Sequence, residues 1–170
     1  MLLMTLKLTQ KETSLLKDQQ NHEKICIQKY QTYASQASDP QLKQLLNTYA
    51  QQEQQHLNTI NQMLSGQVPT MTSSSSQSNQ ESGMQSSAMS SATSSSTTSS
   101  QAATNSQSDS ALCNDMLMTE KFVSGAYDTA IFECADTNIR QALNHIQKEE
   151  QGHGEGLFQY MQSKGMYNTQ

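Results

Sequence analysis

The feature that most limits the fold of this chain is an internal repeat. When residues 22–64 are laid over residues 119–161 without a gap, 12 of the 43 pairs are identical. The identical pairs include several chemically distinctive residues: Glu23/Glu120, Tyr30/Tyr127, Asp39/Asp136, Glu53/Glu150 and His56/His153. Chance matching in a Gln-rich chain does not bring Glu, Tyr, Asp and His together in one register. We infer that the chain contains two copies of one structural unit.

Each copy is predicted to be a pair of antiparallel helices. Asp39 and Pro40 are typical of a helix start, with Asp as the N-cap and Pro at the first helical position. Asp136 occupies the same place in the second copy. The connections before these two residues are short, so the helices of each copy must run antiparallel. Only 34% of the residues are hydrophobic and strand-forming runs are scarce, which favours an all-α fold.

A polar segment separates the two copies. Residues 72–110 consist mainly of Ser, Thr and Gln, with Glu81 and Asp109 as the only charged residues and no aromatic residue. Such a composition cannot bury enough apolar surface to offset the entropy of ordering, and it predicts disorder. The predicted organisation is a first hairpin over residues 9–65, a disordered linker over 66–110 and a second hairpin over 111–164. Together the hairpins would form one ferritin-like four-helix bundle with a long crossover connection; a swapped or dimeric arrangement of hairpins is the alternative.

The side of each helix that faces the bundle interior can be predicted from a spacing of four and three residues. In the four predicted helices the positions with this spacing are, in chain order, Leu16, Gln19, Glu23, Cys26, Tyr30, Tyr33 and Ala37; Leu42, Leu46, Tyr49, Glu53, His56, Ile60 and Met63; Cys113, Met116, Glu120, Val123, Tyr127, Ala130 and Cys134; and Ile139, Leu143, Ile146, Glu150, His153, Leu157 and Tyr160. These inward-facing rows contain acidic residues and histidines among apolar ones.

Six of the inward-facing residues are candidate metal ligands: Glu23, Glu53, His56, Glu120, Glu150 and His153. Glu23 and Glu53 are each 15 residues from Ser38, so at ~1.5 Å per residue they lie at one level, ~22 Å from their turn. The repeat places the other Glu pair at the same level. A Glu from two helices and a Glu-x-x-His from the other two is the ligand set of di-iron and di-manganese bundles. We therefore predict two divalent cations, iron or manganese, with zinc as an alternative; an inherited site without metal is the competing interpretation.

Several other residues have simpler predicted roles. Tyr30 and Tyr127 are expected to be core tyrosines with satisfied hydroxyl groups, although contact with the metal ligands is an alternative. Cys26 and Cys134 are expected to be small buried residues. Surface or boundary positions are predicted for His22 and His145, and solvated positions for Glu133, Glu149 and Glu155.

Charge and composition exclude several classes of function. The net charge is −5 and the basic residues are scattered, so the sequence does not indicate nucleic-acid binding. No apolar run approaches the ~20 residues that span a bilayer. The first residues lack the pattern of a secretory signal, which predicts synthesis in the cytoplasm. Three cysteines at these spacings, Cys26, Cys113 and Cys134, favour a reducing compartment over a disulfide framework.

The segment "EKFVSGAYDTAIFECADTNIRQALNHIQKEEQGHGEGLFQYMQSKGMY" resembles the C-terminal part of the Coat F family of spore coat proteins, and "QQEQQHLNTINQML" resembles the first half of the same proteins. The resemblance covers both predicted hairpins, roughly 110 residues, and leaves out the Ser-rich segment. It implies a ferritin-like fold, synthesis in an endospore-forming bacterium and deposition on the spore.

Two functions follow from these observations. The resemblance implies a structural or assembly role in the spore coat, with other coat proteins as partners and no catalytic residue or organic cofactor. The six candidate ligands indicate the alternative, a di-metal oxidoreductase that acts on peroxide or oxygen in the manner of manganese catalases or rubrerythrin-like proteins. A homo-oligomer is compatible with either function.

Overall fold

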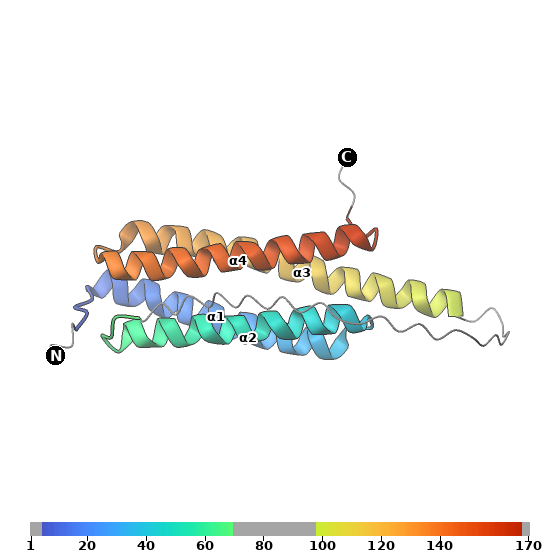
Figure 1. Cartoon of the computed structure of the whole chain (residues 1–170), viewed down its shortest axis with the longest axis horizontal. Helices are drawn as coiled ribbons and strands as arrows, with labels where there is room; N and C mark the ends of the chain where they lie inside the picture. The colour runs from blue at the N-terminus through green and yellow to red at the C-terminus, as the bar shows by residue number, and fades with distance from the viewer. Residues whose placement is uncertain (1–4, 70–97, 168–170) are drawn as a thin grey trace, which may run out of the picture.

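The protein is a four-helix bundle made of two antiparallel helical hairpins (Figure 1). The computed structural model describes residues 5–69 and 98–167, and the side chains of the third helix from residue 108 on. The helices are α1 (Gln10–Gln36), α2 (Pro40–Leu64), α3 (Thr98–Glu133) and α4 (Thr137–Ser163). The helix α1 packs against α2 and α3 against α4, and the two hairpins meet mainly through α1 and α3. The predicted fold class is confirmed.

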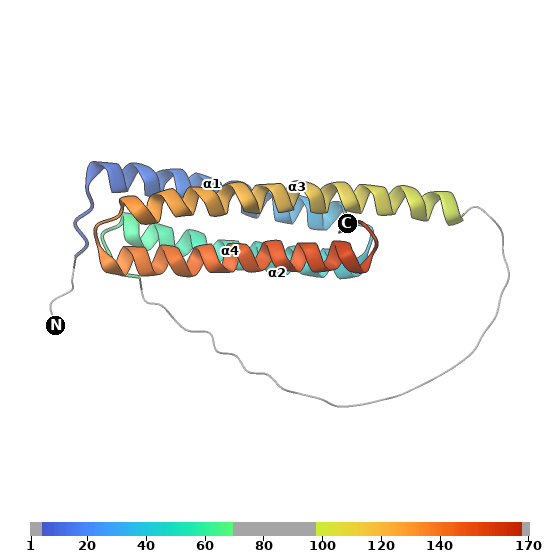
Figure 2. The ribbon, with the colours of Figure 1, turned by 90° about the horizontal axis from the view of Figure 1, so that it is seen from above.

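The connection between the hairpins joins two helix ends that lie far apart. The end of α2 and the start of α3 lie at opposite ends of the molecule (Figures 1 and 2). A single long crossover of this kind is the connectivity of ferritin-like bundles. Residues 70–97 of the predicted linker lie outside the described residues.

The third helix is longer than predicted. It has 36 residues, against 25 to 27 in the other three, and its N-terminal part extends past the end of the bundle (Figure 2). Residues 98–110, which we assigned to the linker, therefore belong to a helix. The physical reason is cooperativity: once the packed part of α3 has formed, each further residue adds a hydrogen bond without a new nucleation cost.

Side chains cap the starts of three helices. Asp39 accepts a hydrogen bond from the backbone nitrogen of Gln41 at 2.9 Å, and Pro40 takes the first helical position of α2. Asp136 accepts in the same way at the start of α4, so both predicted caps are present. At the start of α1, Thr9 and Glu12 form a reciprocal capping box.

Each hairpin has one carboxylate that accepts hydrogen bonds from the turn of the other hairpin. Glu12 Oε1 accepts a hydrogen bond from the backbone nitrogen of Ala135 at 2.7 Å. Asp109 accepts from the backbone nitrogens of Ser38 at 2.8 Å and Asp39 at 3.0 Å. Glu12 and Asp109 are 97 residues apart, as are Ser38 and Ala135, so these contacts obey the same repeat. The duplication therefore extends beyond residues 22–64, and Asp109 belongs to the bundle instead of the linker.

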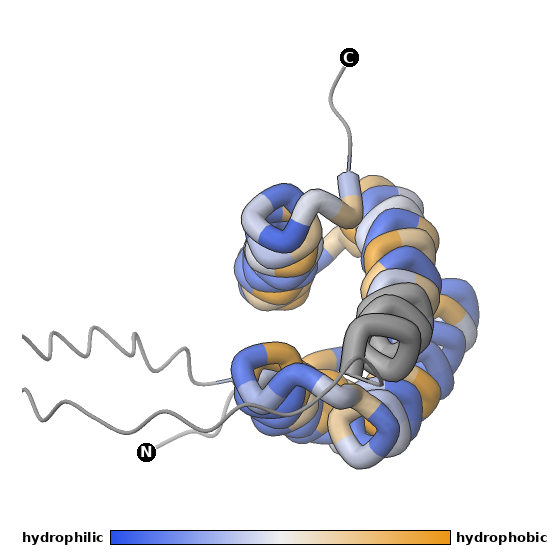
Figure 3. Tube along the Cα trace, turned by 90° about the vertical axis from the view of Figure 1, so that its right-hand side faces the viewer, coloured by the Kyte–Doolittle hydropathy of each residue, from blue (hydrophilic) through white to orange (hydrophobic). Residues whose placement is uncertain are grey.

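The core follows the predicted inward-facing rows, with one exception. Every predicted position of α2, α3 and α4 is buried. Figure 3 shows that hydrophobic residues recur along the Cα trace between hydrophilic ones. In α1, Ala34 is buried and Tyr33 is only half-buried, because the 3.6-residue period moves the buried face by one position near the helix end. The Tyr33 hydroxyl instead donates a hydrogen bond to Asp115 Oδ2 at 2.5 Å.

None of the four described helices has an apolar stretch of the length needed to span a bilayer.

Candidate metal centre

The structure brings all six candidate ligands to one place in the middle of the bundle. Each of the four helices contributes: Glu23 from α1, Glu53 and His56 from α2, Glu120 from α3, and Glu150 and His153 from α4. Their side chains are no more than 2% exposed. A dense group of acids and imidazoles thus replaces apolar packing over one turn of every helix. That these residues hold metal remains a prediction.

The six residues form two overlapping groups. One consists of Glu23, Glu53, His56 and Glu150, and the other of Glu53, Glu120, Glu150 and His153. In each group, one potential ligand atom per residue lies within 4.8 Å of all the others. We call these groups the His56 position and the His153 position. Glu53 and Glu150 belong to both groups, so these two carboxylates would contribute to the binding of each of two cations.

Both imidazoles turn the same nitrogen toward the carboxylates. Nδ1 of His56 lies 3.0 Å from Glu53 Oε2 and 3.2 Å from Glu150 Oε1. Nδ1 of His153 lies 3.2 Å from Glu53 Oε1 and 3.4 Å from Glu120 Oε1. The two rings stack with centroids 5.8 Å apart. Nδ1 is therefore the nitrogen that would bind a cation in both positions.

The other nitrogen of each imidazole binds a residue that the sequence analysis did not assign to the site. His56 Nε2 lies 2.6 Å from Glu149 Oε2, and His153 Nε2 lies 2.6 Å from Gln52 Oε1. The prediction that Glu149 is simply solvated was wrong: its side chain is 35% exposed but contacts His56 across the α2–α4 interface. Gln52 and Glu149 are equivalent in the repeat and each directly precedes a candidate ligand, which is the signal that could have found them.

The two core tyrosines also contact the candidate ligands. The Tyr30 hydroxyl donates a hydrogen bond to Glu120 Oε1, and the Tyr127 hydroxyl donates one to Glu23 Oε1. Both tyrosines are fully buried. The expectation of core tyrosines with satisfied hydroxyl groups is confirmed, and the partners that satisfy them are the two unshared glutamates. These bonds fix the orientation of one oxygen of each glutamate.

Without a cation, the cluster is held together by protons. Burial raises the pKa of Glu53 to about 7 and raises that of Glu150 well above its usual range. Burial acts in the same direction on Glu23, but interactions with His56, Glu53 and Glu150 together outweigh it and lower the Glu23 pKa to about 2. Burial lowers the pKa of His153, yet hydrogen bonds with neighbouring carboxylates outweigh it and raise that pKa to about 11. A cation that enters must displace protons from this cluster.

The residues present fit a pair of divalent cations. Among the described residues, Oε2 atoms of Glu23, Glu120 and Glu150 are buried without a hydrogen-bond partner. Such orphaned acceptors are costly in a protein interior unless something compensates them. Two divalent cations would balance four ionised carboxylates while both imidazoles stay neutral. Carboxylate oxygen and imidazole nitrogen suit iron and manganese.

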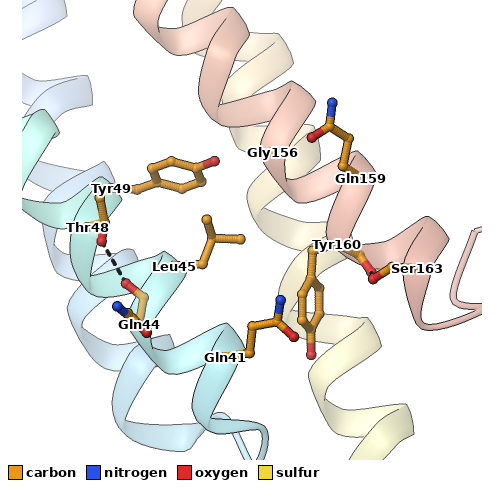
Figure 4. A pocket seen from close by; sticks show the side chains of 9 residues that line it. All are labelled: Gln41, Gln44, Leu45, Thr48, Tyr49, Gly156, Gln159, Tyr160 and Ser163. Carbon is orange, nitrogen blue, oxygen red and sulfur yellow. Dashed lines mark hydrogen bonds between the residues drawn. The ribbon is translucent and has the colours of Figure 1, made fainter. Parts of the chain in front are cut away.

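Two surface cavities approach the centre. A cavity of about 370 Å³ between α3 and α4 is lined by Glu120 and Glu150 together with Leu117 and Gly154. A second cavity, of about 540 Å³, lies between α2 and α4 and is lined by Tyr49 (Figure 4). The first cavity therefore borders Glu120 and Glu150 of the cluster directly, and the second does not border any of the six candidate ligands.

Tyr49 lies between the second cavity and the centre, and it packs on a glycine. Its side chain reaches from α2 toward Gly156 on α4 (Figure 4), and a Cβ at Gly156 would lie 1.7 Å from the Tyr49 hydroxyl oxygen. The Tyr49 ring also packs on His153, with ring centroids 4.4 Å apart. Gly156 is therefore needed for this contact, whereas a Cβ at Gly152 would meet no atom within 4 Å.

Within the described residues, the other two histidines, Glu133 and Glu155 form no hydrogen bond or ion pair with the six candidate ligands. His145 is largely exposed and pairs with Glu149 at 3.0 Å, and His22 is half-buried, edge-on to Phe122. Glu133 pairs with Lys11 at the surface. Cys26 and Cys134 are buried in the core as predicted, with Glu155 exposed.

Comparison with known proteins identifies the second half of the chain. Residues 108–170, a range that includes α4 and the packed part of α3, match the model of the Coat F domain. This confirms the resemblance for that half; the matched range does not include the first hairpin. The match to this domain supports the assignment of the chain as a spore coat protein. No curated protein and no solved structure matched the chain.

Proposed function

We propose that the protein is a structural component of the spore coat whose bundle core holds two divalent cations, iron or manganese. The Coat F domain supports the coat assignment. The observation that carries the metal assignment is the cluster of four buried carboxylates and two imidazoles contributed by all four helices. The connectivity and this ligand set support kinship with ferritin-like bundles.

Bound cations would serve the structural role directly. The two hairpins are joined along the chain only by the long connection between α2 and α3. The shared ligands Glu53 and Glu150 come from different hairpins, so each cation would cross-link the two. A ligand that binds only the folded state stabilises it, by ~2.7 kcal/mol at 100 times its dissociation constant. Such a clamp suits a protein that must persist in a spore.

Metal analysis tests the cation assignment. The full chain, purified without chelator from cells supplied with manganese and iron, is expected to contain two ions per chain by elemental analysis. Glu53→Ala with Glu150→Ala removes both shared ligands and should abolish binding. Glu133→Ala with Glu155→Ala removes two exposed carboxylates and should leave both ions in place. Fewer than one ion per wild-type chain would contradict the assignment, and circular dichroism checks that each variant is helical.

We propose that the α1–α3 face docks other coat proteins. Three large apolar side chains are exposed on it, Ile25 (50%), Met118 (64%) and Phe122 (67%), around a groove of about 290 Å³. Phe132 is also exposed (82%) but lies near the end of α3, away from this groove.

Fractionation of purified spores tests the coat role. The protein is expected in the extracted coat fraction and not in the decoated core. Phe122→Ser should reduce its deposition several-fold, whereas Phe132→Ser, the matched control, should not. Recovery of the wild-type protein only from the lysate of the sporulating cell would contradict the coat role.

An oxidoreductase that acts on peroxide or oxygen is the second candidate, and the cavity between α3 and α4 favours it. This cavity brings a small molecule to Glu120 and Glu150, and a bound di-metal pair would supply redox chemistry there. Gly154→Leu would fill the cavity next to Leu117, while Gly152→Leu adds the same side chain where no atom lies nearby. Peroxide turnover by the metal-loaded protein, slowed by Gly154→Leu but not by Gly152→Leu, would support the enzyme. Absence of turnover in the loaded wild type would exclude it.

A further inference from the structure

The two cation positions have the same inner residues but different outer partners. Each has one unshared glutamate, one histidine and the two shared glutamates. Each histidine presents Nδ1 to the centre and Nε2 to the outside. The distances from Nε2 to its outer partner are the same, 2.6 Å in both positions.

The outer partners differ in charge. Nε2 of His56 donates to the carboxylate of Glu149, whereas Nε2 of His153 donates to the carboxamide oxygen of Gln52. Both histidines are 2% exposed, so burial does not distinguish them. The other oxygen of Glu149 lies 3.0 Å from His145 Nε2, which holds the carboxylate in place.

A carboxylate acceptor makes an imidazole a stronger metal ligand than a neutral amide does. It pulls the Nε2 proton toward itself and increases the electron density at Nδ1, and its negative charge attracts the cation. Removal of such an outer partner typically lowers metal affinity ~10–100-fold. The inner residues and the tyrosine bonds to the unshared glutamates are matched between the positions. Tyr49 packs on His153 alone, but its ring carries no charge, so the outer partner is the difference that changes the charge beside an imidazole.

We propose that the two cation positions are unequal and fill in order, the His56 position first, because Glu149 supports His56 with a carboxylate where Gln52 supports His153 with an amide. Glu149 and Gln52 are therefore positioning residues that set the order of loading. This inference rests on the proposed di-metal centre.

Titration of the metal-free full chain with Mn²⁺, with free Mn²⁺ followed by electron paramagnetic resonance, measures the two affinities. The wild type should bind two ions in two steps. Glu149→Gln should weaken the first step ~10-fold or more and leave the second nearly unchanged. Gln52→Glu should tighten the second step by a similar factor and leave the first nearly unchanged. Each substitution nearly preserves the shape of the side chain, and Glu149 and Gln52 occupy equivalent positions of the repeat.

The equivalent pair Glu23 and Glu120 identifies which position fills first. Glu23→Gln removes an oxygen ligand of the His56 position and should weaken the first step, while Glu120→Gln should weaken only the second. When Gln52→Glu and Glu149→Gln are combined, the effects of these two ligand variants should exchange.

The outcomes separate this inference from the proposed function. If the wild type binds no Mn²⁺, the di-metal centre itself is wrong. If it binds two ions but Glu149→Gln leaves the first step unchanged, or Glu23→Gln and Glu120→Gln have the same effect, the centre stands and the order of loading is overturned.

Discussion

The two hairpins carry the same set of candidate ligands but differ in the residues that surround them. Glu23, Glu53 and His56 of the first hairpin have Glu120, Glu150 and His153 as their equivalents. The carboxylates that reach to the opposite turn, Glu12 and Asp109, are also equivalent.

The differences lie one layer outside the cluster. Gln52 corresponds to Glu149, so the two histidines have unlike partners. Tyr49 corresponds to Ile146, and its packing on α4 requires a glycine at position 156, where the first hairpin has Thr59. Since the inner residues coincide and the outer ones do not, the duplication preserved the centre and allowed its two ends to diverge.

The largest loss of stability is expected when either histidine of the cluster is replaced. In the metal-free protein, His56→Ala and His153→Ala each remove the positive partner of buried carboxylates, which should cost ~3–5 kcal/mol of unfolding free energy. Urea denaturation with chelator present measures this cost. His145→Ala, at an exposed ion pair, should cost less than ~1 kcal/mol. Losses as small as that for His56→Ala and His153→Ala would mean that the imidazoles do not hold the metal-free cluster together.

The next effect concerns the glycines of α4. Alanine at position 156 would overlap the Tyr49 hydroxyl, and such overpacking should cost ~1–3 kcal/mol. Alanine at position 152 meets nothing and should stabilise the helix by up to ~1 kcal/mol. Adding Tyr49→Phe to Gly156→Ala removes the overlapping atom and should recover part of the loss. Equal effects of the two alanines in thermal unfolding would show that Tyr49 does not pack on Gly156.

The stability of the metal-free protein should fall as pH rises from 7 to 9. The folded-state pKa of His153 is raised to about 11, so its stabilising contribution is complete below ~pH 6.5 and is lost as pH rises toward 11. One such proton changes the unfolding free energy by at most ~1.4 kcal/mol per pH unit. The pKa of Glu53 is raised to about 7, so the stability that its proton contributes is lost as pH rises through 7.

Urea midpoints at pH 7, 8 and 9, with chelator, test this pH dependence. In the protein loaded with Mn²⁺, the imidazoles are already neutral, so the fall should be smaller. A metal-free protein that gains stability over this range would contradict the charge state assigned to the cluster.

The smallest expected effect compares the two carboxylates that reach across to the opposite turn. Glu12→Ala and Asp109→Ala each remove a cap from backbone nitrogens of the opposite hairpin, at a cost of ~0.5–2 kcal/mol. Glu12 accepts one of its backbone hydrogen bonds from Ala135 and the other from Thr9 of its own hairpin, whereas Asp109 accepts from Ser38 and Asp39. Because each variant loses two such bonds, the losses should agree within ~0.5 kcal/mol. A negligible loss for Asp109→Ala alone would indicate that this part of α3 does not belong to the bundle.

Much of the fold could be predicted from sequence because the repeat and the periodicity carry it. The Asp caps and the four-three spacing fix where α2 and α4 start and which sides are buried. The start of α3 could not be predicted, because helix extension into a Ser/Thr-rich segment depends on the packed helix that follows it. The position of Tyr33 was wrong because a strict four-three step departs from the true helical period near the end of α1.

The inner residues of the site were accessible to sequence reasoning, and its outer contacts were not. The register of the repeat sets the six candidate ligands at one level, and the structure places them together there. Their role in metal binding remains a prediction. The contacts of Glu149 and Gln52 depend on how closely α2 and α4 approach and on which nitrogen each imidazole turns outward. Neither quantity can be obtained from spacing within a single helix.

We propose above that one cluster of six side chains from both hairpins binds two cations. Anomalous diffraction from crystals of the full chain grown with Mn²⁺ tests it most directly. Two anomalous peaks are expected between the helices, one beside Nδ1 of His56 and one beside Nδ1 of His153, with the His56 peak the stronger when Mn²⁺ is limiting. Crystals with Mn²⁺ bound only at the surface, and no peak among the six residues, would contradict it.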